Sequence, residues 1–399
     1  MKVLFDTQCF DAQKFGGISR YFCEIMKNFP TCDEFILPCI YSRNEYLKQS
    51  NLINCLEDDT TFESFLPNLD FFGKEHLFWL RSKLLPTKAK INKKECIKAL
   101  KSQDFDVFHP TYYDSYFVEY IGKKPFVLTI HDMIYERYPK FFRNTHKIIK
   151  NKKLLAEKAA KIIAISNKTK DDIIEFYGPS FSDKIEIVYH GSSLKRADFN
   201  EKSIDFNSKF GKYFLYTGAR NHYKNFLFFI ESCADFLREK NLKIVCTGLS
   251  FSKKEFSYFE SLDIADRVIH HFASDNELFW LYKNALAFVF PSYYEGFGIP
   301  ILEAFEAETP CLLAKASCFP EIAEDAALYF DPENKNEIVS AMSKILDKDL
   351  AEELIEKGKK RLTNFSWKKT AEKTTKIYKS IIESTHNPQK TSQNRLADR

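Results

Sequence analysis

Short apolar runs alternate along the chain with longer amphipathic stretches, and this alternation most narrows the range of possible folds. The runs are rich in Val, Ile, Leu and Phe, as is typical of strands buried on both faces. Between them, stretches such as NKKLLAEKAAKII and DNELFWLYKNA have helical periodicity. The pattern predicts an α/β fold of parallel, doubly wound sheets. The expected strands span residues 2–6, 35–41, 106–110, 126–132, 161–166 and 186–191, and then 213–218, 242–248, 267–272, 286–292 and 310–315.

The length of the chain predicts two domains, because 399 residues exceed what one hydrophobic core usually organises. The stretch at 192–212 is polar and lacks apolar periodicity, so it is the expected linker. We therefore place an N-terminal domain at residues 1–200 and a C-terminal domain at 201–370. The segment 385–399 has almost no apolar residues, which predicts a disordered tail.

The composition favours a cytoplasmic globular protein. The ten cysteines form no Cys-x-x-Cys pair, a pattern typical of reduced, buried cysteine. No apolar run approaches the roughly 18 residues of a membrane span. The N-terminus MKVLFDTQCF enters a strand directly, so no signal peptide is expected. Any contact with a membrane should be peripheral, at its inner face.

The net charge of +4 does not require a nucleic-acid partner, but the charge is unevenly distributed. Between Lys74 and Lys101, nine Lys or Arg residues stand against two glutamates, with aromatic and leucine side chains interleaved. One interpretation is a pair of solvated amphipathic helices. The other is that residues 71–101 form a surface that touches anionic lipid headgroups or an anionic acceptor.

The segment PSYYEGFGIPILE at 291–303 combines a glycine-rich turn, a helix start and two glutamates. Gly296 and Gly298 allow positive φ and close approach of a ligand to the backbone. The free N–H groups of Gly298, Ile299 and Ile301 are expected to form an anion site suited to a diphosphate. Glu303, expected in the first helical turn, can accept two hydrogen bonds from a ribose diol, and Glu295 can reach the hydroxyls of a sugar. Alternatively, Glu303 only complements the helix dipole.

Two further segments place cations or bare backbone at strand ends. In YTGARNHYKNF, Arg220 and Lys224 follow a strand and can neutralise a diphosphate, although an ordinary basic loop has the same composition. In FGGISRYF, Gly16 and Gly17 open a helix next to the first strand. The chain has no GxxxxGK[ST] motif, and no GxGxxG follows either first strand, which disfavours a P-loop or a nicotinamide site.

Histidines also stand at strand ends. His131 can donate to a phosphate or a sugar hydroxyl or act as an acid or base, and a structural role is the alternative. His109 is a weaker candidate of the same kind. The pair His270–His271 lacks acidic or cysteine partners at ligand spacing, so zinc is not expected. The acids in DFD at 104–106 lie at the opposite strand end and indicate a turn.

Taken together, these residues resemble the retaining family 4 glycosyltransferases of GT-B fold, in which two Rossmann-like doubly wound domains face each other across a cleft. PSYYEGFGIPILEAFEAETP is similar to the family signature, with its Glu-x7-Glu pair at Glu295 and Glu303. The N-terminal half is similar to members that build bacterial-type surface polysaccharides, including mannosyltransferases. The resemblance covers nearly all of the chain except about 45–100 and the tail. It also rests on YTGARNHYKNF, HHFASDNELFWLYKNALAFVFPS, FPEIAEDAALYFDP, FSWKKTAEKTTKIY, FDTQCFDAQKFGGISRYFCEI, HDMIYERYP, IAISNKTKDDI and IVYHGSS.

The resemblance implies a retaining transferase that moves a hexose or deoxyhexose from a nucleotide-diphosphate sugar to a glycan or lipid-linked acceptor. The N-terminal domain would bind the acceptor and the C-terminal domain the donor, while a final helix at 371–384 would pack back on the N-terminal domain. GDP-mannose is the first choice of donor, with UDP-sugars as the alternative, and no metal or other cofactor is expected. A GT-B epimerase or phosphorylase and an inactive sugar-nucleotide-binding scaffold are further alternatives.

The resemblance also implies roles for individual residues. Glu303 would hold the ribose hydroxyls and Glu295 the donor sugar. Arg220 and Lys224 would stabilise the diphosphate, although many members space this pair more widely. The remaining expected contacts are Gly16 and Gly17 from the N-terminal domain, His131 beside the donor sugar, the backbone of Phe297, Gly298 and Ile299 at the diphosphate, and Phe272 and Ser274 near the nucleobase.

Overall fold

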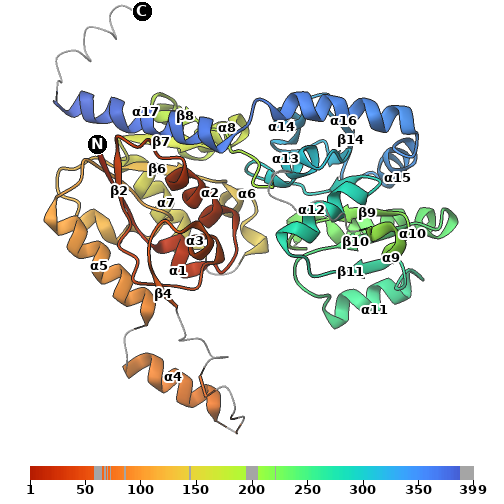
Figure 1. Ribbon diagram of the computed structural model, residues 1–399, viewed down its shortest axis with the longest axis horizontal. Coiled ribbons are helices and arrows are strands. Elements are labelled where there is room, and N and C mark those ends of the chain that lie inside the picture. The colour runs from red at the N-terminus through yellow and green to blue at the C-terminus, as the bar shows by residue number, and fades with distance from the viewer. Residues whose placement is uncertain are drawn as a thin grey trace, which may run out of the picture.

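The computed structural model consists of two α/β units that lie side by side and are joined by two crossings of the chain (Figure 1). It describes residues 1–57, 65–66, 69, 71, 73–84, 87–142, 145–194, 205–220 and 222–386. Most of the predicted tail, from residue 387 onward, lies outside these residues. Within the described ranges, no helix is both long enough and apolar enough to cross a membrane.

The N-terminal unit is built on six parallel strands in the order β2-β1-β5-β6-β7-β8. The first three and the last three form separate hydrogen-bonded sheets, and a parallel bridge between Phe108 and Phe126 joins them. β1 lies in the interior, with β2 on one side and β5 on the other. The direction of winding therefore changes between β1 and β5, where doubly wound sheets leave a crevice at the carboxyl ends of their strands.

The elements of the N-terminal unit are β1 Lys2–Phe5, α1 Gln8–Ala12, α2 Gly17–Lys27, β2 Glu34–Ile36, β3 Tyr41–Ser42, α3 Glu45–Ser50, β4 Leu56–Glu57, α4 Lys74–Leu84, α5 Lys88–Ser102, β5 Val107–His109, η1 Ser115–Glu119, β6 Val127–Ile130, α6 Ile134–Arg137, η2 Pro139–Phe141, α7 His146–Lys158, β7 Lys161–Ala164, α8 Asn167–Tyr177, η3 Pro179–Lys184 and β8 Ile185–Ile187.

The C-terminal unit contains one six-stranded parallel sheet in the order β11-β10-β9-β12-β13-β14. Its winding changes direction between β9 and β12. The central strands β9, β12 and β13 are buried at every residue, which explains their continuous apolar sequences. The predicted fold class, two Rossmann-like α/β domains of GT-B type, is confirmed.

The elements of the C-terminal unit and the final helix are α9 Phe206–Phe210, β9 Tyr213–Tyr216, η5 His222–Lys224, α10 Phe226–Glu239, β10 Lys243–Cys246, α11 Lys253–Ser261, β11 Val268–His270, α12 Asp275–Asn284, β12 Phe288–Phe290, α13 Ile299–Glu306, β13 Cys311–Ala314, α14 Phe319–Ala323, β14 Ala327–Phe330, α15 Lys335–Lys344, α16 Lys348–Leu362 and α17 Trp367–His386.

The structure differs from the expected strands in two respects. The strand expected at 35–41 ends at Ile36, because Pro38 has no N–H for the ladder and the backbone N–H of Cys39 turns back to the carbonyl oxygen of Leu37. The sequence analysis also missed β14, the outermost strand of the C-terminal sheet, and the two-residue strands β3 and β4. β3 and β4 have only two residues each, whereas β14 has four and lies at the edge of the sheet, with its two central residues only partly buried.

The final helix α17 returns to the N-terminal unit and packs along α2 (Figure 1). It begins at Trp367, four residues before the expected start at 371. The Tyr378 hydroxyl lies 2.6 Å from Nδ1 of His109, and both side chains are fully buried. His109 therefore forms a buried hydrogen bond with a residue of α17. The two crossings of the chain touch each other at Gly191 and Trp367.

Gly191→Ala should destabilise the protein because a Cβ atom there would lie 2.3 Å from the backbone nitrogen of Trp367. Backbone cannot move aside easily, so we expect the free energy of unfolding to fall by about 1–3 kcal/mol, as for other overpacked sites. Urea denaturation measures this. The matched control is Gly17→Ala, where a Cβ atom would meet no protein atom within 4 Å. Equal stability of the two variants would contradict the close contact between the crossings.

Candidate active site

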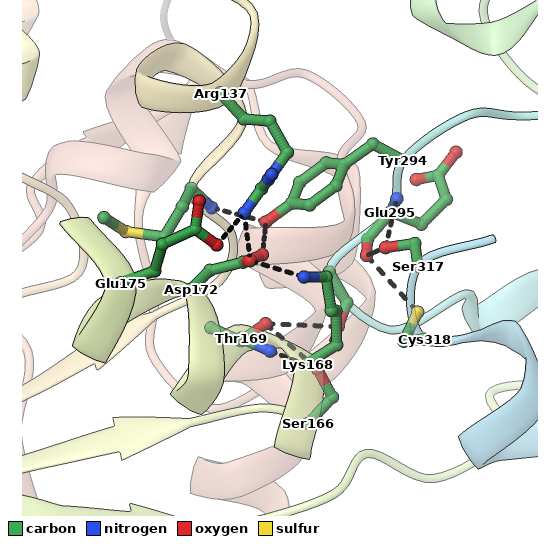
Figure 2. A network of polar contacts seen from close by, with 12 residues as sticks. Arg137, Ser166, Lys168, Thr169, Asp172, Glu175, Tyr294, Glu295, Ser317 and Cys318 are labelled. Atoms are coloured by element: carbon green, nitrogen blue, oxygen red, sulfur yellow. Dashed lines mark hydrogen bonds and ion pairs between the residues drawn. The ribbon is translucent and has the colours of Figure 1, made fainter. Parts of the chain in front are cut away.

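The loop between β12 and α13 carries Glu295 into the interface between the two units. The backbone N–H of Glu295 donates to the Ser317 hydroxyl at 3.2 Å, and that hydroxyl donates to the Glu295 carbonyl oxygen at 2.7 Å. The Glu295 carboxylate forms an ion pair with Lys224. The loop is thus held through its main chain, and the carboxylate is directed away from the residues that hold it (Figure 2).

The two candidate cations have different partners. Lys224 pairs with Glu295, whereas Nε of Arg220 lies 2.6 Å from the carboxylate of Glu255, and Nη2 donates to the carbonyl oxygen of Ser250. The Arg220 guanidinium also lies 4.8 Å from the ring centre of Phe251. Its Nη1 atom is buried and has no hydrogen-bond partner in the described part of the chain. Both residues follow β9, at the point where the winding of the C-terminal sheet changes direction.

Glu303 is paired with a cation from the other unit. It is buried, and its carboxylate accepts hydrogen bonds from Nη1 of Arg20 and from the Tyr282 hydroxyl, both at 3.2 Å. Burial raises the pKa of Glu303, and the charge of Arg20 opposes part of this rise. Arg20 also bonds Asp275 at 3.3 Å. This contact joins α2 of one unit to α13 and α12 of the other.

Two expectations for α13 are corrected. Glu303 is the fifth residue of α13 and lies in its second turn instead of its first. The N–H of Ile301 is not free, because it donates to the carbonyl oxygen of Gly298 at 2.9 Å. Gly298 precedes the helix with φ of 88°, a left-handed conformation that favours glycine.

The Gly-Gly pair lies at the start of α2, which begins at Gly17 with Gly16 as its N-cap. The Ser19 hydroxyl donates to the Gly16 carbonyl oxygen at 3.0 Å, which stabilises the turn. A Cβ atom on Gly17 would meet no protein atom within 4 Å. The space beside this helix start is therefore open to a ligand.

His131 faces the Glu295 loop across a cavity of about 200 Å³ between the units. His131, Asp132, Gln13 and several tyrosines line it from the N-terminal unit, and Tyr223, Glu295 and Gly296 from the C-terminal unit. Burial, helped by the charge of Lys152, lowers the pKa of His131 to about 3. The imidazole is therefore neutral near pH 7, which favours hydrogen bonding to a ligand over a role as an acid.

The residues expected near the nucleobase lie after β11. Phe272 is exposed to 75%, and the Ser274 hydroxyl caps α12 by accepting from the N–H of Glu277 at 3.3 Å. Phe297 is buried against His190, with 4.8 Å between ring centroids, so only its backbone remains a candidate contact. His109 lies away from this interface, under α17.

A set of hydrogen bonds, the interdomain clasp, fastens the Glu295 loop to the N-terminal unit (Figure 2). It consists of Tyr294 and Gly296 with Met133, Ser166, Thr169 and Asp172. The Tyr294 hydroxyl donates to Asp172 Oδ2 at 2.7 Å and accepts from the N–H of Met133 at 3.0 Å. The Gly296 carbonyl oxygen accepts from the hydroxyls of Ser166 at 2.7 Å and Thr169 at 3.3 Å. The residues on both sides of Glu295 are thus anchored.

The charge of Asp172 is balanced within the clasp. Asp172 is fully buried, and its Oδ1 atom lies 2.6 Å from both Arg137 Nη2 and Lys168 Nζ (Figure 2). A buried carboxylate requires such partners, because its desolvation otherwise outweighs its attractions. With both cations supplied by its own unit, Asp172 can accept the hydroxyl of Tyr294 without further compensation.

Sequence reasoning missed Arg20 as the partner of Glu303 and missed the whole clasp. It also missed Lys152, a fully buried lysine whose Nζ donates to the Asp132 carbonyl oxygen at 3.0 Å behind the cavity wall. Ser166 and Asp172 belong to the segment IAISNKTKDDI, but the sequence carries no signal that pairs them with a loop more than 100 residues away.

The two facing doubly wound units, with candidate residues from both at their interface, define a GT-B architecture. Two family models match the chain: one described as glycosyl transferases group 1 over residues 198–361, and one described as glycosyltransferase family 4 over residues 63–196. The chain belongs to the family 4 glycosyltransferases of GT-B fold, and it is similar to mannosyltransferases of that family. The resemblance of the sequence to this family and its GT-B fold is confirmed.

Individual relatives extend this comparison. The chain is 32% identical over 219 residues to the O-antigen chain mannosyltransferase RfbU of Salmonella typhimurium, a match that covers 55% of this chain and 60% of RfbU. It is 27% identical over 301 residues to an uncharacterized glycosyltransferase of Methanocaldococcus jannaschii, covering 70% and 76% of the two chains. The structure of Anabaena HepE in complex with UDP and glucose matches with a TM-score of 0.70 over 95% of this chain and all of HepE, at 16% identity.

Tyr294→Phe should weaken the interdomain clasp. The buried Met133 N–H and Asp172 Oδ2 would each lose a partner, so we expect the free energy of unfolding to fall by about 1–3 kcal/mol in urea denaturation. Backbone amides of α8 and of the Glu295 loop should also exchange hydrogen faster in this variant. The matched control is Tyr293→Phe, which removes a hydroxyl from a neighbour outside the clasp. An unchanged urea midpoint for Tyr294→Phe would show that the hydroxyl does not bridge the units.

Acid should destabilise the fold through three buried histidines. Burial lowers the pKa of His109 and His131 to about 3 and that of His190 well below its ordinary value. The unfolded chain takes up these protons below pH of about 6.5 and the folded chain does not, so stability is lost as pH falls from about 6.5. Each proton contributes a slope of about 1.4 kcal/mol per pH unit.

Urea denaturation at pH values from 7 to 5 measures this slope. His190→Phe keeps an aromatic ring against Trp367 and removes one of the three titrating groups. We expect the pH dependence of this variant to be shallower by about one proton. An identical slope for wild type and variant would contradict the assignment of His190 as a buried neutral imidazole.

Proposed function

We propose that the chain is a retaining glycosyltransferase that moves a hexose from a nucleotide-diphosphate sugar to a hydroxyl of a glycan or glycolipid. One observation carries the proposal most directly: Glu295, with Lys224 beside it, and His131 from the other unit line one cavity between the units. GDP-mannose is the first choice of donor because RfbU and the O-antigen chain mannosyltransferase B of Escherichia coli are mannosyltransferases by name. A UDP-sugar is the alternative, and HepE was solved with UDP.

We assign the donor contacts as follows. Glu303 holds the ribose hydroxyls, in place of its contacts with Arg20 and Tyr282. Glu295 holds hydroxyls of the donor sugar, and His131 donates a hydrogen bond to that sugar as a neutral imidazole. Arg220 and Lys224 bind the diphosphate, together with the backbone at Phe297, Gly298 and Ile299 and at the open Gly16–Gly17 turn. Phe272 and Ser274 lie toward the nucleobase.

The chemistry follows from where charge develops. Cleavage of the anomeric bond leaves negative charge on the diphosphate and an oxocarbenium-like sugar. Fixed cations and helix N–H groups at the leaving phosphate stabilise this charge, typically by about 3–4 kcal/mol per donor. Arg220 and Lys224 can supply positive charge without a metal ion. The acceptor hydroxyl attacks on the face from which the diphosphate departs, and the phosphate takes its proton, which retains the anomeric configuration.

The helix α4 offers a surface for a membrane that holds the acceptor. It projects from the N-terminal unit (Figure 1) and exposes Leu77, Trp79 and Leu80 to between 44% and 50%. Apolar side chains next to Lys74 and Arg81 suit an anionic lipid surface. We propose that residues 71–101 contact the membrane that holds a lipid-linked acceptor.

A thermal-shift panel of nucleotides and nucleotide-sugars tests the donor. We expect GDP and GDP-mannose to raise the melting temperature more than the other bases do. A larger shift with uridine nucleotides would instead favour a UDP-sugar donor. If no nucleotide raises the melting temperature, the proposed function is overturned. A donor-only incubation separates an epimerase, which converts the nucleotide-sugar without an acceptor, from a transferase.

Turnover of two variants tests the site. Glu295→Ala and Arg220→Ala should each lower kcat about 100-fold or more, because each removes a contact to the reacting part of the donor. The matched control is Arg238→Ala, which removes an arginine of α10 that pairs with Asp235 outside the cleft. Turnover at the wild-type level in either site variant would overturn the assignment. EDTA should leave the wild-type rate unchanged if the cations of the chain suffice.

A further inference from the structure

A second cavity of about 300 Å³ lies in the N-terminal unit, outside the proposed donor site. We call it the β1–β5 cavity, because its walls come from the residues that follow these two strands and from the start of α5. The lining residues are Thr7, Gln8 and Asp11 after β1, Tyr112, Asp114 and Tyr116 after β5, and Ala89, Lys90 and Lys93 on α5.

The cavity lies where open parallel sheets usually bind their ligands. Open parallel sheets bind ligands beyond the carboxyl ends of their strands, where the winding changes direction. In the C-terminal unit this place lies between β9 and β12, where Arg220, Lys224 and the Glu295 loop are found. In the N-terminal unit it lies between β1 and β5, and the β1–β5 cavity occupies it.

The β1–β5 cavity adjoins the 200 Å³ cavity through a shared wall. Tyr112 lines both cavities. Its ring packs on Tyr113, with 4.5 Å between ring centroids, and its hydroxyl lies 3.4 Å from that of Tyr135. The two cavities are therefore neighbours, and a molecule that fills both must pass the Tyr112 ring.

The polar groups of the cavity are held in place by one another. The Gln8 amide donates to Asp6 Oδ2 and accepts from the N–H of Asp114, both at 2.7 Å. Asp11 accepts from the Thr7 hydroxyl at 2.7 Å and from the Asn92 amide at 2.6 Å. A carboxylate has about four acceptor positions, so these groups can accept further hydroxyl hydrogens without reorganising.

The charged residues that line the cavity balance, with Lys90 and Lys93 against Asp11 and Asp114, which favours a neutral ligand. Lys93 is paired with Asp114 at 2.9 Å and lies 4.4 Å from the ring centre of Tyr116. Its charge is therefore compensated within the protein. Ordered carboxylates together with tyrosine faces suit a neutral, polyhydroxylated ring, whose hydroxyls meet the acids and whose C–H faces pack on the aromatic side chains.

We propose that the β1–β5 cavity binds the penultimate sugar residue of a neutral oligosaccharide acceptor, while the terminal residue lies in the 200 Å³ cavity. This inference rests on the proposed function, and it names the acceptor class of the same enzyme. An acceptor that fills both cavities has at least two sugar residues. The enzyme would therefore elongate a glycan that an earlier glycosyl transfer has begun.

Ala89→Trp tests the proposal. Ala89 is exposed in the first turn of α5 and lines the cavity, so an indole there fills the space without disturbing a core. The matched control is Lys98→Trp, an exposed position nine residues further along the same helix, on its opposite face. Wild type and both variants are applied, with the nucleoside diphosphate that stabilises them, to an array of immobilised mono-, di- and trisaccharides.

We expect wild type and Lys98→Trp to bind at least one disaccharide about tenfold more tightly than its terminal monosaccharide, and Ala89→Trp to lose this gain. Equal binding of mono- and disaccharides, an unchanged preference in Ala89→Trp, or no glycan binding at all would overturn the inference. Stabilisation of each protein by the nucleoside diphosphate shows, independently of glycan binding, that the protein is folded and that its donor site is intact. If that stabilisation is absent in wild type, the proposed function itself fails.

Discussion

The contact between Gly296 and the backbone of His131 sets the spacing of the two units. A Cβ atom at residue 296 would lie 1.8 Å from the His131 carbonyl oxygen, so only glycine allows the loop of one unit to approach the strand end of the other this closely. The clasp then holds this approach through the Gly296 carbonyl oxygen and the Tyr294 hydroxyl. Glu295, between these anchors, is placed opposite His131 by the interface together with its main-chain bonds to Ser317.

Each charged side chain assigned to the donor site pairs with an opposite charge. Lys224 pairs with Glu295, Arg220 with Glu255 and Glu303 with Arg20. These groups are mostly buried, and a lone charge in such surroundings is strongly disfavoured. In our proposal a bound nucleotide-sugar replaces these partners. Its diphosphate binds the cations, and its hydroxyls bind the acids. The pairing therefore keeps the charged side chains in place for the ligand.

Much of the architecture could be predicted because buried parallel strands have a local signature. Eleven apolar runs marked the strands of both sheets, and the structure has a strand in each of them. The failures were local as well: Pro38 ended β2 early, and β14 is an edge strand whose two central residues are only partly buried. Glu295, Arg220, Lys224 and His131 were singled out because each follows a strand. Their partners were not, since Glu255, Arg20 and Asp172 come from helices that carry no comparable sequence signal.

The sequence alone determined which residues follow the strands, because apolar periodicity marks the strands and parallel strands share one carboxyl edge. It also determined the glycine turn that precedes α13 and lies between Glu295 and Glu303. Only the tertiary structure decided what these residues face. The pairing of Glu303 with Arg20, the clasp around Glu295 and the adjoining cavities at Tyr112 all join segments distant in the chain. Such contacts depend on how two folded units pack, and local sequence patterns do not encode that packing.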